Sequence, residues 1–137
     1  MRLSASLLLL ALLPAGLAGQ QLTHKNGEPA WEGRTLTQWV GELGSAAPLS
    51  RTEAAYAIAG MAKEAGPATP ALVKALDDES NPVRVAAMVA LREIGPPAEA
   101  AIPKLVELLD DRNDEVAYFA RKAIKAIKPS ALPPEYQ

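Results

Sequence analysis

PALVKALDD at residues 70–78 returns as PKLVELLDD at residues 103–111, so positions 70 and 103 lie 33 residues apart. The same offset carries Ile58 onto Leu91, and it runs through residues 36–127 without a gap. The proline, the paired aspartates and the apolar positions all stay in phase. A fixed period of this length is typical of stacked supersecondary units, so the chain is expected to repeat one structural unit.

Each unit has the pattern of two short helices. A proline opens the first helix, where its missing N–H costs nothing. Aspartates then mark a turn with helix-capping chemistry, and a longer helix follows with apolar residues at 3–4 spacing. We therefore expect an all-α fold, a short α-solenoid of three helical hairpins with period 33. The domain spans 34–128 in units 34–66, 67–99 and 100–128, with first helices over 36–43, 70–76 and 101–109 and second helices over 49–62, 82–94 and 115–127.

The first eighteen residues are typical of a secretory signal peptide. Arg2 supplies a positive start, residues 7–13 are apolar, and Gly16-Leu17-Ala18 offers small residues for cleavage. A retained membrane anchor is the alternative, but spanning a bilayer takes roughly 20 apolar residues. The sequence thus predicts a signal peptide at 1–18 and export to the periplasm, the cell envelope or the extracellular space. No stable membrane insertion is expected after cleavage.

The segments on either side of the repeats lack helical periodicity. Residues 19–33 are expected to form a loose leader. Residues 129–137 contain three prolines and are expected to form a non-helical tail. Trp39 stands where the next unit has Leu72, so it is expected to close the exposed end of the stack.

The repeat resembles the HEAT repeat, in the short form shared by many bacterial arrays and by bilin-lyase-like HEAT proteins. The stretch from Pro70 through Asp78 and Arg84 to Gly95 carries this resemblance, which extends over 36–127. It implies a ladder between turn aspartates and second-helix arginines, interrupted at Ala117. The WEGRTL motif at 31–36, followed by Trp39, is similar to the lead-in of some exported bacterial HEAT proteins.

Composition argues against several classes of site. The chain has no cysteine, and His24 is its single histidine, so neither a zinc site nor a di-iron site is expected. The acidic residues at 77–79 and 110–115 do not have EF-hand spacing, and turn and capping roles account for them. No nucleophile or phosphate-binding motif occurs. We expect no catalytic residues, no metal and no cofactor.

The outward side of the second helices is the predicted partner surface, because second helices line the concave side of HEAT solenoids. This surface is apolar and aromatic, and it becomes basic toward the C-terminus. Two alternatives to partner binding stay open. The apolar residues of this surface could pack between helices, and its basic residues could form a solvated helix end. The candidate residues are Tyr56, Val85, Met88, Val89, Arg92, Tyr118, Arg121, Lys122 and Lys125.

The functional expectation is a non-enzymatic interaction or scaffold module for an unknown protein or peptide, with its oligomeric state open. An enzyme subunit or a chromophore-handling protein resembling bilin lyases is the alternative. A nucleic-acid binder is not expected, because the formal net charge of the chain is −2 and such binders usually carry a basic excess.

Overall fold

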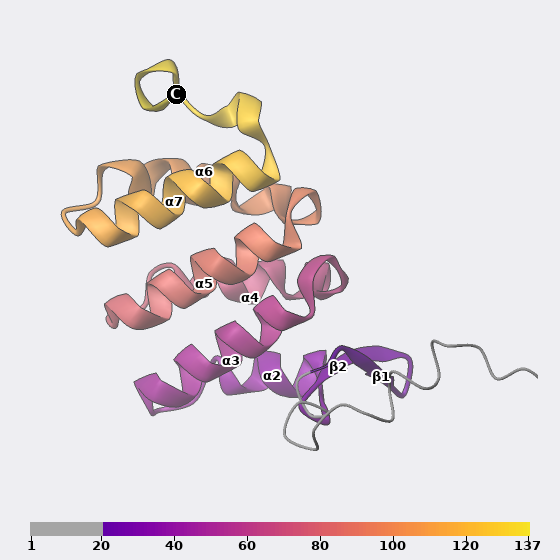
Figure 1. Cartoon of the computed structure of the whole chain (residues 1–137). Coiled ribbons are helices and arrows are strands. Elements are labelled where there is room, and N and C mark those ends of the chain that lie inside the picture. The colour runs from indigo at the N-terminus through magenta and orange to yellow at the C-terminus, as the bar shows by residue number, and fades with distance from the viewer. Residues whose placement is uncertain (1–20) are drawn as a thin grey trace, which may run out of the picture.

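The computed structural model describes residues 21–137, so the signal peptide expected at 1–18 lies outside the described residues. Figure 1 shows the chain rising through a stack of helical hairpins from the N-terminal to the C-terminal side. The α-helices are α2 (Leu36–Glu42), α3 (Pro48–Gly60), α4 (Thr69–Ala75), α5 (Asn81–Ile94), α6 (Ile102–Glu107) and α7 (Asp114–Ile127). Short 3-10 segments join or follow them: η2 (Ala62–Ala68), η3 (Pro96–Ala101), η4 (Leu108–Asp110), η5 (Pro129–Ala131) and η6 (Pro134–Tyr136).

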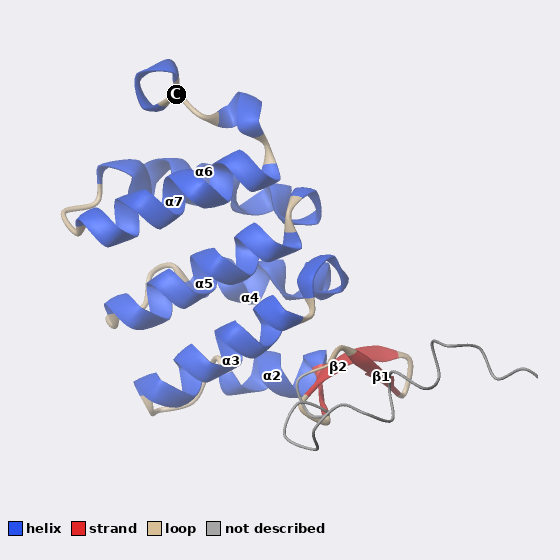
Figure 2. Cartoon of the chain, in the orientation of Figure 1, coloured by secondary structure: helices blue, strands red, loops and turns tan. Residues whose placement is uncertain are grey.

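The helices form two layers. The second helices α3, α5 and α7 stack directly on one another, and the shorter helices α2, α4 and α6 lie behind them (Figures 1 and 2). This arrangement confirms the prediction of an all-α solenoid of three hairpins. Each predicted helix begins and ends within a few residues of the observed one, and α6 stops earlier because its last turn tightens into η4.

The core follows the 33-residue offset. Ile58, Leu91 and Ile124 occupy equivalent positions in the three units, and all three are fully buried. Another equivalent position in the three units holds the small residues Ala54, Ala87 and Ala120, which are also fully buried. Small side chains at that position let successive second helices approach closely. Trp39, which is equivalent to Leu72 of the next unit, packs into the same core at the N-terminal end of the stack, as expected.

Charged rungs join consecutive units. Arg51 of α3 donates two hydrogen bonds to Asp78, at 2.8 and 2.9 Å, and Arg84 of α5 donates one to Asp111 at 3.0 Å. Each arginine therefore pairs with the turn aspartate of the following unit. These are the two arginine–aspartate rungs in the described part of the chain. The equivalent position in the third unit is Ala117, which cannot form a third rung.

The prediction of a loose leader at 19–33 is wrong for residues 21–33. These residues open a three-stranded antiparallel sheet, here called the meander, made of β1 (Thr23–Lys25), β2 (Glu28–Trp31) and β3 (Arg34–Thr35). Two-residue turns at Asn26-Gly27 and Glu32-Gly33 join the strands, and all four turn residues have positive φ. Such turns match the twist of paired strands, and Asn-Gly is their strongest sequence signal.

The meander rests against the first hairpin. The indole ring of Trp31 packs directly over Gly60, where an added Cβ would lie 2.8 Å from ring atoms. The indole nitrogen of Trp39 donates to the backbone oxygen of Trp31 at 3.0 Å. His24 is not in a loose segment either, because its Nε2 lies 2.6 Å from the Glu64 carboxylate.

The tail at 129–137 also differs from expectation. It forms two short 3-10 turns, η5 and η6, where a non-helical segment was expected. Leu132 is buried, and the hydroxyl of Tyr136 donates to Asp110. Proline fixes a φ that suits a first helical turn, so the prolines that prevent a long helix start these short turns.

Candidate functional site

The second-helix face divides the predicted residues into two groups. Met88 is fully buried and Val85 is almost so, because both lie between neighbouring helices of the stack. Their assignment to an exposed patch is therefore wrong, and the packing alternative holds for them. Val89 is half-buried against the core. The middle of this face consequently offers a partner little apolar side-chain surface.

Arg92 is engaged within its own helix. It is half-buried, and it donates two hydrogen bonds, at 2.6 and 3.0 Å, to the neighbouring Glu93. Its charge is thus compensated by an adjacent carboxylate, and its attraction for an acidic partner is weakened accordingly.

The basic end of the face lies on α7. Tyr118, Arg121, Lys122 and Lys125 are all exposed, and they line a small hollow of about 160 Å³. The ammonium of Lys122 lies 5.3 Å from the centroid of the Tyr118 ring, within cation–π range. Within residues 21–137, no ion pair involves Arg121, Lys122 or Lys125. We call these four residues the basic cluster.

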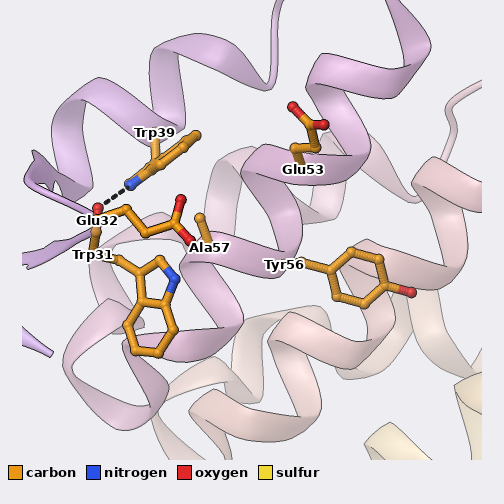
Figure 3. Close-up of a pocket in the computed structure, with 6 residues that line it drawn as sticks. All are labelled: Trp31, Glu32, Trp39, Glu53, Tyr56 and Ala57. Carbon is orange, nitrogen blue, oxygen red and sulfur yellow. Dashed lines mark hydrogen bonds between the residues drawn. The ribbon is translucent and has the colours of Figure 1, made fainter. Parts of the chain in front are cut away.

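A second hollow lies at the N-terminal end of the same face (Figure 3). Its volume is about 620 Å³, within the range of ligand-binding clefts. Residues from the meander, α2 and α3 line it, and both tryptophans of the chain are among them. We call it the aromatic pocket, and its lining residues are Trp31, Glu32, Trp39, Glu53, Tyr56 and Ala57.

Two exposed glutamates line the aromatic pocket. In Figure 3, Glu32 reaches between the two indole rings toward Ala57, whereas Glu53 lies beyond Trp39 with its carboxylate pointing away from the rings. In the described part of the chain, neither carboxylate forms a hydrogen bond or an ion pair. The pocket therefore combines aromatic walls with uncompensated negative charge.

Trp39 is held firmly in this pocket. Besides its hydrogen bond to Trp31, the ring lies under the guanidinium of Arg34, 4.2 Å from the ring centroid. Arg34 in turn donates to the Glu42 carboxylate at 2.9 Å. The wall of the pocket is thus fixed before any ligand arrives.

Tyr56 was one of the predicted partner residues, but the pocket that it lines was not expected from the sequence. The pocket exists because the meander carries Trp31 and Glu32 against α3, and a loose leader could not do so. The Asn26-Gly27 dipeptide was the signal that could have revealed the meander, since it stands between two segments that pair.

The turn aspartates have structural roles. Besides their arginines, Asp78 accepts the backbone N–H of Ser80, and Asp111 accepts that of Asn113. The bond from Arg51 chiefly lowers the pKa of Asp78, and the bond from the Asn113 backbone chiefly lowers the pKa of Asp111. Among residues 21–137, no three His, Asp or Glu side chains gather in a way that could hold a metal ion.

Comparison with known families agrees with this architecture. A sequence model of HEAT repeats matches residues 36–127, the stretch that holds α2 to α7. No curated protein matches the chain. Within the described residues, the helices are too short or too polar to cross a membrane. The matched stretch covers well over half of the sequence and coincides with the three stacked hairpins, so the chain belongs to the HEAT-repeat family.

Proposed function

We propose that this protein is a non-enzymatic, exported interaction module that binds a protein partner on its second-helix face. HEAT repeats generally mediate protein–protein interaction or scaffolding. One observation carries the finer assignment: the basic cluster on α7 gathers three cations without carboxylate partners, within residues 21–137, around an exposed tyrosine.

The chemistry of the basic cluster favours an acidic segment of the partner. Uncompensated surface cations raise the association rate of an acidic partner and orient it. Tyr118 adds a rigid aromatic contact of the kind that dominates binding energy at interfaces. Arg121 adds a planar donor that can hold a carboxylate with two parallel hydrogen bonds.

Site-directed photo-crosslinking tests this surface. A photoreactive residue placed at Tyr118 of the full chain should capture a defined partner in the cells that make the protein. The triple substitution Arg121→Glu, Lys122→Glu and Lys125→Glu should abolish that capture, because it reverses the field that attracts the acidic segment.

A matched variant carries the same change in charge elsewhere: Lys25→Glu, Lys63→Glu and Lys74→Glu, all at exposed positions away from α7. This variant should capture the partner as the unmodified chain does. Undiminished capture by both triple variants would show that the basic cluster does not determine binding and that another surface does. Loss of capture in both would point to a general effect of acidity.

Export needs a separate test, because the expected signal peptide lies outside the described residues. The full chain with a C-terminal tag should be recovered outside the cytoplasm with its first residue at Gly19. Replacing Leu9 and Leu10 by Arg should keep the protein in the cytoplasm, since an interrupted apolar segment no longer works as a signal. Recovery of unprocessed chain outside the cytoplasm would contradict cleavage after Ala18.

A further inference from the structure

We propose that the aromatic pocket binds the guanidinium of an arginine side chain presented by a protein partner. This inference deepens the proposed function and rests on it in one respect, the existence of a protein partner. It concerns the opposite end of the second-helix face, so the partner would present an arginine to the pocket and an acidic segment to the basic cluster.

The first argument is charge. Glu32 and Glu53 bring two carboxylates to one hollow, and in the described part of the chain neither has a cationic partner. An anionic ligand would be repelled there, and a neutral one would leave both charges uncompensated. A cation is the ligand that both carboxylates would attract.

The second argument is the aromatic lining. The indole rings of Trp31 and Trp39 lie on either side of Glu32 in this hollow, and Tyr56 also lines it, with its ring pointing away from the indoles (Figure 3). Cations are attracted to the faces of such rings, tryptophan most strongly. Among cations, arginine fits rings and carboxylates together, because its planar guanidinium stacks on a ring while its N–H groups bond a carboxylate edge-on.

The third argument is that Arg34 of the same chain already lies between an indole ring and a carboxylate. The guanidinium of Arg34 lies 4.2 Å from the centre of the Trp39 ring and bonds the Glu42 carboxylate at 2.9 Å. A guanidinium between an indole and a glutamate is therefore an arrangement that this segment already forms. The aromatic pocket presents the same pair of groups to a ligand from outside.

The size of the pocket agrees with a side chain carried on a peptide. A volume of about 620 Å³ is larger than one guanidinium needs and leaves room for flanking backbone. The hydrogen bond between Trp39 and Trp31, together with the Arg34 contact, fixes the walls beforehand. A fixed site loses less conformational entropy on binding.

Tryptophan fluorescence provides a direct test, because both tryptophans of the chain line this pocket. The probe is the peptide acetyl-Gly-Gly-Arg-Gly-Gly-amide, titrated into the protein at low salt. The control peptide carries citrulline, which has the shape of arginine without the charge. We expect a saturable emission change with arginine, and binding weaker by about tenfold or more with citrulline.

Two variants locate the effect. Glu32→Gln with Glu53→Gln should weaken arginine-peptide binding by about tenfold or more, since it removes the charge and keeps the shape. Glu79→Gln removes an exposed carboxylate outside the pocket and should leave binding unchanged. Circular dichroism of each variant separates a lost site from a lost fold.

Three results would overturn the proposal. Equal responses to arginine and citrulline would mean that charge is not recognised. Equal binding by the double variant would place the cation elsewhere. Concentration-dependent self-association in sedimentation, lost in the double variant, would assign the pocket to the basic cluster of a second copy. None of these readouts depends on the crosslinking test, so the two proposals can fail separately.

Discussion

The helical stack is held together by contacts that repeat from unit to unit, whereas the meander is held by contacts that occur once. The stack repeats its contacts: Ile58, Leu91 and Ile124 fill the same position in successive units, and each second helix packs on the next. The meander uses each contact once, and the packing of Trp31 over Gly60 has no counterpart elsewhere in the described chain. Damage to the stack should therefore spread through the fold, whereas damage to the meander should stay local.

The largest effect is expected at the centre of the stack. Leu91→Ala removes a fully buried side chain from the middle unit, and such truncations cost about 2 to 5 kcal/mol. The middle unit contacts both neighbours. In a urea titration, the helical circular dichroism and the tryptophan emission should therefore change in one common transition, at a lower urea concentration than for the unmodified chain.

Leu49→Ala is the control for this prediction, since Leu49 is 70% exposed at the start of α3. Its free energy of unfolding should stay within about 0.5 kcal/mol of the unmodified value. Two separate transitions for Leu91→Ala would contradict the expected cooperation between units and make the stack a set of independent hairpins.

A smaller, local effect is expected where the meander meets α3. Gly60→Ala places a methyl group 2.8 Å from the Trp31 ring, so the ring has to move. Overpacking of this kind costs about 1 to 3 kcal/mol. Tryptophan emission should shift toward the red as Trp31 becomes exposed, while the helical circular dichroism signal stays the same.

The matched control is Gly41→Ala in α2, where an added Cβ meets nothing within 4 Å. There the exchange should stabilise the protein by about 0.5 to 1 kcal/mol, because alanine favours the helix. An unchanged emission spectrum in Gly60→Ala would show that the meander does not depend on the Trp31 contact.

The contrast between repeated and single contacts also explains which parts of the fold the sequence could predict. The 33-residue offset relates positions such as Ile58 and Leu91 in different units, so the helices could be placed from the sequence. The same repetition misled at Val85, because its equivalence to the exposed Tyr118 of the third unit does not measure how tightly one pair of helices packs.

The aromatic pocket could not be predicted in the same way. Its two halves come from segments with different periods, β2 at one side and α3 at the other. No internal copy of the meander exists to align, and its strands are too short for alternation to be visible. The Asn26-Gly27 turn could be predicted from the sequence. The position of Trp31 could not, because its ring packs where Gly60 has no side chain, and that tertiary contact leaves no local sequence pattern.

The charged ladder should give the next effect in size. Asp78→Asn weakens both bonds from Arg51 and should lower the Tm by a few degrees, more than Asp111→Asn, because Arg84 donates only one bond to Asp111. The pKa of each aspartate is lowered in the folded state. Its contribution is therefore complete above the ordinary aspartate pKa of about 4.

That contribution is lost as the pH falls through the lowered pKa of the folded state. The Tm of the unmodified chain should therefore fall more steeply with acid than that of Asp78→Asn, and the two values should converge. Thermal unfolding followed between neutral pH and about pH 2 tests this. Parallel curves would show that the Asp78 charge does not stabilise the fold.

The smallest effect on stability is expected at Glu32, where one substitution should change stability and peptide binding in opposite directions. Glu32 has a φ of +51°, a conformation that asparagine adopts more readily than glutamate. Glu32→Asn would turn Glu-Gly into the preferred Asn-Gly turn, so it should stabilise the protein by about 0.5 kcal/mol. It would also remove a pocket carboxylate and weaken binding of the arginine peptide.

Ala62→Asn is the counterpart of this change within the stack, since Ala62, the first residue of η2, has a φ of +50°. It should give a similar gain in stability and leave the peptide titration unchanged, because Ala62 does not line the aromatic pocket. Opposite changes in stability and binding at Glu32, beside a gain in stability alone at Ala62, would show that glutamate is kept at this turn for its carboxylate. A loss of stability in Glu32→Asn would instead mean that the carboxylate supports the meander itself, and the pocket charge would then have a structural explanation.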